Sequence, residues 1–115
     1  MKTRSGFFGV YPMLYSFFRA DGRLDHEAIK RQIEVFLTAG VHGFAILGIA
    51  SEMEKLSTPE RRAFLETAAE TISGRKPLAV TLPEASVLEN RALAKAAQEA
   101  GADWLILQPP PVRSA

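Results

Sequence analysis

Short apolar runs alternate with stretches of helical periodicity along the chain, and this alternation constrains the fold more than any other feature. Helical patterns cover residues 25–39, 58–73 and 87–100. Apolar runs of strand length lie near 8–14, 44–48, 77–82 and 104–108. Strands that are joined through helices by short connections form right-handed crossovers and a parallel sheet. The sequence therefore predicts an α/β fold of about four parallel strands alternating with three helices.

The junction between a helix and the next strand occurs twice in similar form. The letters AGV at 39–41 precede one apolar run, and the letters AGA at 100–102 precede another. These junctions lie two strand–helix units apart, which indicates an internal repeat of the βα type. Gly40 can take the left-handed conformation that closes a helix.

Capping signals mark where two of the helices begin. Asp25 is suited to cap the first helix, and Ser57 with Glu60 forms a capping box at the start of the second. Gly74 is expected to end the second helix, and Trp104 to begin a buried strand. The helical residues expected to face the core are Ile29, Ile33, Phe36, Leu37, Phe64, Leu65, Ala68, Ile72, Leu93, Ala96, Ala97 and Ala100.

Composition argues against several classes of function. The formal net charge is +1, so the sequence predicts neither a nucleic-acid surface nor binding to an anionic membrane. With no cysteine, the chain offers no disulfide and no thiolate ligand or nucleophile. No apolar stretch reaches the length of a membrane span. The apolar N-terminal stretch is broken by Gly9 and Pro12 and does not match a signal peptide, so we expect a cytoplasmic protein.

Metal and nucleotide sites are not predicted either. His26 and His42 lie far apart with no patterned carboxylate between them, which is a poor arrangement for a metal. The letters GIAS at 48–51 lack the Gly-Lys-Ser/Thr of a phosphate loop and the glycine pattern of a dinucleotide fold. We therefore expect no cofactor.

The length of the chain fits one domain but not a complete βα barrel. An eightfold barrel needs about 250 residues, and this chain has 115. A four-stranded open sheet would leave long apolar edge strands, which favour aggregation. The last apolar run is followed by QPPPVRSA rather than by a helix that could cover it. We therefore expect the chain to be part of a longer protein.

Four segments, in this order and with these spacings, resemble the dihydrodipicolinate synthase / N-acetylneuraminate lyase family. They are GVYPMLYSFFRADGRLD at 9–25, AGVHGFAILGIASEMEKLSTPER at 39–61, RKPLAVTLPEAS at 75–86 and AKAAQEAGADWLILQPPP at 94–111. Together they extend over essentially the whole chain. The resemblance implies the N-terminal half of a (β/α)8 TIM barrel.

The resemblance also implies a chemistry. The family consists of class I aldolases and lyases, in which a lysine on the sixth strand forms a Schiff base with pyruvate or another 2-oxo acid. A tyrosine on the fifth strand assists proton transfer. Both strands would lie beyond this chain, so no catalytic residue is predicted within it. Family members are commonly homo-oligomers.

The loop after the second strand is the predicted substrate-binding segment. In the family it offers backbone amides and two threonine hydroxyls to the carboxylate of the 2-oxo acid. The threonines correspond to Ile49 and Ala50, which keep the amides but not the hydroxyls. Ser51 stands at a family glycine and Glu52 at a family glutamate. The predicted set is Gly48, Ile49, Ala50, Ser51 and Glu52.

Other departures separate the chain from dihydrodipicolinate synthase itself. Ser16-Phe17-Phe18 replaces a Thr-Pro-Phe turn, and Pro111 and Val112 stand where tyrosines often follow Pro-Pro. A relative that acts on a sugar-acid or aromatic 2-oxo acid is therefore expected. Tyr11, Tyr15, Phe17 and Phe18 form either an apolar substrate surface or simply part of the closure of the barrel.

The lysines within the chain do not replace the missing one. Lys2 is terminal, Lys30 and Lys95 belong to helices, and Lys76 precedes its strand, at the wrong end for chemistry. Lys55 lies in the loop region, where a solvated side chain is the alternative to a nucleophile that would need a lowered pKa.

Three functional classes follow from the sequence. The first is the N-terminal portion of a Schiff-base 2-oxo-acid lyase or aldolase. The second is a non-catalytic half-barrel that binds a carboxylate or assembles with another subunit. The third is an unrelated doubly wound βα domain with a regulatory role.

Overall fold

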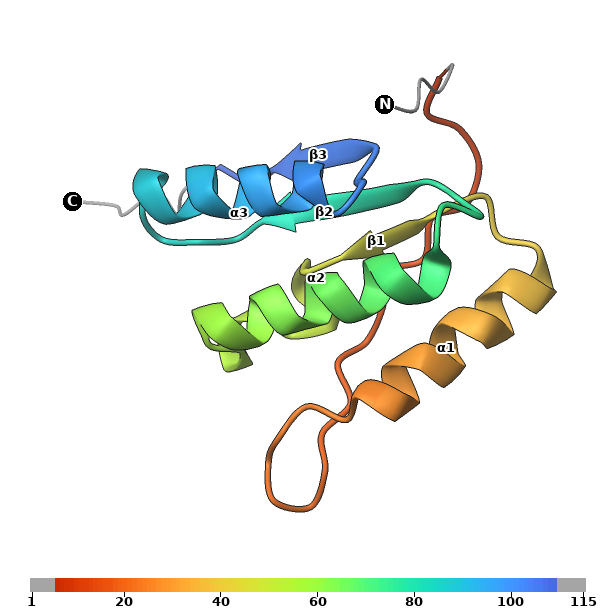
Figure 1. Ribbon diagram of the computed structural model, residues 1–115, viewed down its shortest axis with the longest axis horizontal. Helices are drawn as coiled ribbons and strands as arrows, with labels where there is room; N and C mark the ends of the chain where they lie inside the picture. The colour runs from red at the N-terminus through yellow and green to blue at the C-terminus, as the bar shows by residue number, and fades with distance from the viewer. Residues whose placement is uncertain (1–5, 110–115) are drawn as a thin grey trace.

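Three parallel strands form the sheet of the computed structural model, which describes residues 6–109. The strands are β1 (Phe44–Ile46), β2 (Leu78–Leu82) and β3 (Trp104–Leu107), in the order β1-β2-β3. Three helices, α1 (His26–Ala39), α2 (Thr58–Ile72) and α3 (Val87–Glu99), form a layer on one side of the sheet (Figure 1). Lys2, Pro111 and Val112 lie outside the described residues.

The predicted strand at 8–14 is wrong. Met13 forms an isolated parallel bridge with Ala45, and the rest of this segment follows β1 without forming a ladder. Gly9 takes a φ of 87°, outside the extended region, and Pro12 has no backbone N–H to donate. Hydrogen bonds from the amides of β1 and its preceding turn to the Val10 and Pro12 carbonyls still hold the segment beside the sheet.

The helix predictions are confirmed to within one residue at each end. The Asp25 carboxylate accepts from the Ala28 amide at 3.0 Å, and Gly40 closes α1 with a φ of 85°. Both hydrogen bonds of the Ser57–Glu60 capping box are present. The end of α2 differs slightly, because Ser73 takes the left-handed capping position ahead of Gly74.

The main core lies between the sheet and the helices. Every residue predicted to face it is buried or packs against it. Along β2 the side chains of Leu78, Val80 and Leu82 join this core. Because successive strand side chains point to opposite faces, Ala79 and Thr81 lie on the other face of the sheet.

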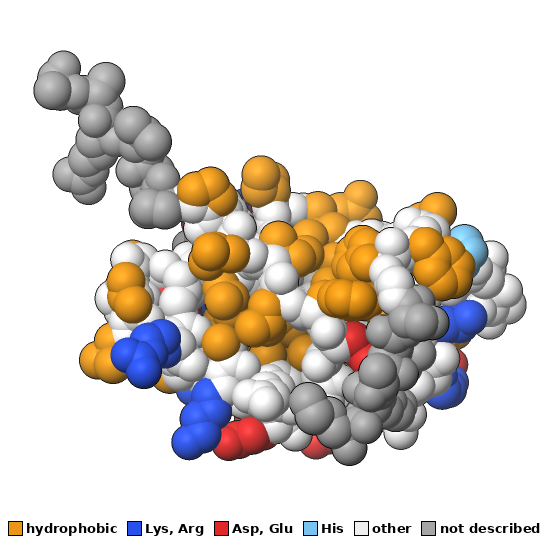
Figure 2. Space-filling view, turned by 90° about the horizontal axis from the view of Figure 1, so that it is seen from above, with side chains coloured by type: hydrophobic (Ala, Val, Ile, Leu, Met, Phe, Trp, Pro, Cys, Tyr) orange, Lys and Arg blue, Asp and Glu red, His pale blue; other side chains and the backbone are white. Residues whose placement is uncertain are grey.

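The expectation that Trp104 begins a buried strand is wrong. Within residues 6–109 no element covers the outer edge of β3, so Trp104 is half-buried, Leu105 is 49 % exposed and Leu107 is 75 % exposed. Figure 2 shows apolar side chains gathered across the middle of the face seen from above, with charged side chains around the rim. The strand has the composition of a buried strand but lies at an edge of the described sheet.

An aromatic cluster packs at the amino-terminal end of the sheet. The Phe7 ring stacks on Tyr11 with centroids 4.4 Å apart and meets Trp104 edge-on at 5.2 Å. The predicted grouping of Tyr11 with Tyr15, Phe17 and Phe18 is therefore not formed. Tyr15 packs instead against Phe17, at 6.4 Å, in the segment that leads to α1.

Candidate functional site

The loop that joins β1 to α2 has an unusual backbone. It consists of two short turns of 3-10 helix, η1 (Ile49–Ser51) and η2 (Met53–Lys55). Leu47 and Glu52, which flank η1, take left-handed φ values of 65° and 54° although neither is glycine. Such conformations cost on the order of 1–3 kcal/mol each and persist where the surroundings fix them. They are concentrated at functional sites, which makes this loop the first candidate.

Ser51 fixes the loop from inside the protein. It is completely buried, and its hydroxyl accepts from the Leu47 amide at 3.0 Å and donates to the Leu14 carbonyl at 2.5 Å. Its own carbonyl accepts from the Ser16 hydroxyl at 2.5 Å. The Ser51 hydroxyl is therefore engaged within the protein, and the residue holds the loop against the segment that follows Met13.

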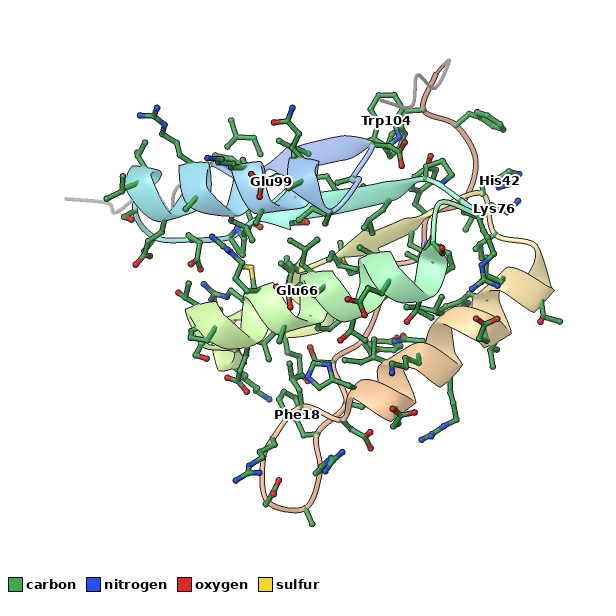
Figure 3. The ribbon with its side chains drawn as sticks, in the orientation of Figure 1. Phe18, His42, Glu66, Lys76, Glu99 and Trp104 are labelled. Carbon is green, nitrogen blue, oxygen red and sulfur yellow. The ribbon has the colours of Figure 1, made fainter. Side chains whose placement is uncertain are left out.

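Glu52 and Lys55 pair with each other at the surface. The Lys55 ammonium lies 2.8 Å from Glu52 Oε1. The hydrogen bond to this carboxylate and its charge raise the pKa of Lys55 above its usual value. A Schiff-base lysine needs a lowered pKa, so the surroundings of Lys55 favour the solvated alternative. Lys76 lies two residues before β2, at the amino-terminal end of the sheet (Figure 3), which confirms its predicted position.

The first part of the loop lines a hollow of about 480 Å³. This hollow lies at the carboxyl ends of the strands, the face at which βα folds bind their ligands. Its lining residues come from the segment before α1, from the loop, from β2 and from β3 with the residues after it: Met13, Gly48, Ile49, Ala50, Thr81, Ile106, Leu107, Gln108 and Pro109. Of the five predicted site residues, the structure brings Gly48, Ile49 and Ala50 together here and directs Ser51 and Glu52 elsewhere.

Two backbone amides of the loop have no partner in the described part of the chain. The amides of Ile49 and Ala50, at the start of η1, donate no hydrogen bond, whereas those of Ser51 and Glu52 bond back to Gly48 and Ile49. The Gly48 amide contacts Met13 Sδ at 3.3 Å. Unpaired backbone amides beside an otherwise apolar hollow are suited to donate hydrogen bonds to the oxygens of a small anion.

A buried ion pair holds the outer part of the same loop, and sequence reasoning missed it. The Glu84 side chain is 1 % exposed and the Arg61 side chain 14 %, and Arg61 Nη1 pairs with Glu84 Oε1. Thr58 donates to the other carboxylate oxygen at 2.8 Å. Arg61 also donates to the Met53 carbonyl from Nε at 3.1 Å and from Nη2 at 2.7 Å. Burial lowers the pKa of Arg61 below its usual value.

The histidines have structural partners rather than metal-site neighbours. His42 Nδ1 accepts from the Val10 amide at 2.9 Å, and His26 Nδ1 lies 2.6 Å from the Thr67 hydroxyl. Among residues 6–109, no three histidine or acidic side chains are grouped as a metal would require. In the same range no helix is long and apolar enough to cross a membrane.

Parallel strands in sequential order, with the three described helices on one side of the sheet, are typical of the βα-barrel class of α/β protein. The chain belongs to the dihydrodipicolinate synthetase family, whose model matches residues 6–111. This membership confirms the resemblance and excludes the unrelated doubly wound regulatory domain.

Relatives with different activities match the chain at comparable levels. It is 34 % identical over 104 residues to a 4-hydroxy-tetrahydrodipicolinate synthase of Salinibacter ruber, covering 90 % of this chain and 34 % of the relative. It is 31 % identical over 102 residues to the L-2-keto-3-deoxyarabonate dehydratase of Azospirillum brasilense, covering 89 % and 33 %. The chain thus spans about a third of the length of these curated relatives.

A solved structure supports the same assignment. It is that of YagE, a prophage protein of the dihydrodipicolinic acid synthase family from Escherichia coli K12, in complex with pyruvate. The chain superposes on it with a TM-score of 0.87 at 31 % identity, covering 92 % of this chain and 36 % of YagE.

Proposed function

We propose that the chain is the N-terminal portion, about a third of the length, of a (β/α)8-barrel protein that forms a Schiff base with a 2-oxo acid and acts as a lyase or aldolase. In this proposal the catalytic lysine and tyrosine come from residues beyond Ala115. The loop at Gly48–Glu52 holds the carboxylate of a pyruvate-type substrate. A cytoplasmic homo-oligomer belongs to the same proposal.

The observation that carries this proposal is the pair of amides beside the hollow that have no partner within the described part of the chain. Ile49 and Ala50 offer two donors on one side of a space of about 480 Å³. A carboxylate has two oxygens that accept such donors. The strained backbone at Leu47 and Glu52 and the anchor at Ser51 hold these donors in place, as pre-organised binding requires. The pyruvate complex of YagE supports the choice of ligand.

The substrate differs, in this proposal, from that of dihydrodipicolinate synthase. Ile49 and Ala50 lack the two hydroxyls that the family uses beside the carboxylate, and Ile49 is 81 % exposed with an apolar side chain. A sugar-acid or aromatic 2-oxo acid is therefore the proposed substrate class. The lining residues of the hollow do not include Tyr11, Tyr15, Phe17 or Phe18. These aromatic residues therefore do not decide between a sugar-acid and an aromatic substrate.

A non-catalytic half-barrel is the second candidate, and one observation favours it. The outer edge of β3 exposes Leu105 and Leu107. Another subunit that supplied a strand there would bury this edge, as parallel sheets require. Binding of a carboxylate or assembly would then be the role of the chain, without chemistry of its own.

The intact mass of the protein from its natural source separates the two candidates. The catalytic proposal expects a mass near that of a full barrel and one reduced adduct after treatment with pyruvate and borohydride. Residues 1–115 expressed alone should gain no adduct. An adduct on Lys55 would contradict the assignment of the catalytic lysine to a later strand. A native mass equal to that of the 115 residues would favour the half-barrel.

Substituting proline for Ile49 tests the amide site. Gly48 has an extended backbone, φ −89° and ψ −164°, which a following proline favours, and Ile49 is the first residue of η1. Ile49→Pro should therefore remove one free donor while the loop keeps its shape. We expect the pyruvate concentration that gives half-maximal adduct to rise about tenfold, as loss of a hydrogen bond to a charged group predicts.

Ile49→Ala is the matched control, because it shortens the same side chain and keeps the amide. It should leave the half-maximal concentration near that of the wild type. Equal behaviour of the proline and alanine variants would show that the amide of Ile49 does not bind the carboxylate.

A further inference from the structure

Thr81 is a buried polar residue whose hydroxyl has no partner among residues 6–109. It is 2 % exposed, and its hydroxyl oxygen makes no hydrogen bond with any described residue. Leaving a buried hydroxyl unpaired usually costs about 1–3 kcal/mol. Such a group in a folded protein calls for an explanation, and a functional role is one of them.

The position of Thr81 connects it to the candidate site. It lies on the face of β2 that points away from the helices, one residue before the strand ends, and its register partner on β3 is Ile106. Both residues line the hollow that Gly48, Ile49 and Ala50 also line. Among the described lining residues, Thr81 and Gln108 are the two with polar side chains.

The other buried polar atom without a partner among the described residues lies away from the candidate site. Trp104 Nε1 is also buried without a hydrogen bond among the described residues. Trp104, however, packs against Phe7 at the amino-terminal end of the sheet and is not a lining residue of the hollow. Of the two unpaired groups, Thr81 is the one beside the free amides.

We propose that Thr81 is a substrate-contacting residue whose hydroxyl donates a hydrogen bond to the carboxylate of the 2-oxo acid. This inference rests on the proposed function of the loop. The Thr81 hydroxyl adds a donor from β2 to a site in which Ile49 and Ala50 supply only backbone amides. In the structure the hydroxyl oxygen is shielded from solvent. Rotation about the Cα–Cβ bond to another staggered position brings the hydroxyl to the ligand.

The substitution Thr81→Val separates binding from stability. Valine has nearly the same shape but no hydroxyl, so it removes an unpaired polar group from the interior. In the intact protein from its natural source, we expect the melting temperature to stay the same or rise. The pyruvate concentration for half-maximal borohydride-trapped adduct should rise about tenfold or more, because a hydrogen bond to a charged group is lost.

Two further variants complete the experiment. Thr81→Ser keeps the hydroxyl and should retain a half-maximal pyruvate concentration near that of the wild type. Thr71→Val makes the same change on α2, where the hydroxyl donates to the Thr67 carbonyl at 2.7 Å, and should not alter the pyruvate dependence.

The other outcomes overturn the inference. If Thr81→Val lowers the melting temperature and leaves the pyruvate dependence unchanged, the hydroxyl has a structural partner elsewhere in the intact protein. If neither quantity changes, the hydroxyl contacts nothing of consequence. A wild-type protein that forms no adduct at all would remove the proposed function, and the inference with it.

Discussion

Replacing Arg61 by leucine is expected to lower the free energy of unfolding by about 3–5 kcal/mol. The substitution would leave the Glu84 carboxylate, whose side chain is 1 % exposed, without the cation that lies against it. Removal of one partner of a buried ion pair leaves a charge in a medium of low polarity, and this loss exceeds the net stabilisation by the pair. The Met53 carbonyl would also lose two donors.

Urea unfolding of the intact protein measures the effect, and a double-mutant cycle isolates the pair. Glu84→Leu should be strongly destabilising as well, because Arg61 then loses its carboxylate. The double variant Arg61→Leu with Glu84→Leu should be much less destabilised than the sum of the two, since no charge is left buried alone. Additive effects would contradict direct coupling between the two side chains.

Arg75→Leu is the matched control for the loss of an arginine. Arg75, in the turn after α2, pairs with Glu34 of α1 at 2.7 Å, but both side chains are about half exposed. Exposed pairs of this kind contribute little because water screens them. The control should therefore be far less destabilised than Arg61→Leu, and a similar loss in both variants would show that burial of the Glu84 pair is not the cause.

Replacing Gly43 by alanine is expected to destabilise the protein by about 1–3 kcal/mol, because the new methyl group overlaps the ring of Tyr11. A Cβ at this position would lie much closer to three atoms of that ring than van der Waals contact allows. The ring cannot retreat easily, because it stacks on Phe7 with centroids 4.4 Å apart. Gly43 is not among the residues with positive φ, so the effect is steric rather than conformational.

Thermal unfolding of Gly43→Ala and of two further variants tests this explanation. Gly48→Ala should be less destabilising, because its Cβ meets the flexible tip of Met13 rather than a ring. Adding Tyr11→Leu to Gly43→Ala should recover part of the loss, since a smaller side chain leaves room for the methyl group. A double variant that is no more stable than Gly43→Ala would contradict a clash with Tyr11.

The site was only partly predictable from the sequence. The loop was found from its glycine, its small residues and the resemblance to a family, and the structure places Gly48, Ile49 and Ala50 at one hollow. The inward position of Ser51 was not found, because it depends on a hydrogen bond to Leu14, 37 residues earlier. Glu84 gave one weak signal, because it is an acidic residue two positions after the apolar run at 77–82.

Helix limits, caps and the inward faces of the helices were determined by the sequence itself. Asp25 and Ser57 accept hydrogen bonds from amides three residues away. The apolar residues that α2 buries recur with the helical period along a single segment of sequence. These are local interactions, so the order of residues contains them. The parallel direction of the strands also followed, because short helical connections between strands produce parallel pairing.

Only the tertiary structure decided the features that depend on distant residues. The segment near Met13 forms only an isolated bridge with β1. The strand β3 is exposed because no described element covers its edge. Arg61 meets Glu84 across 23 residues. Thr81 lines the hollow next to Ile106 because these two residues are paired in the register of β2 with β3. Strand pairing, burial and charge pairing join residues far apart in the chain, and no local pattern specifies them.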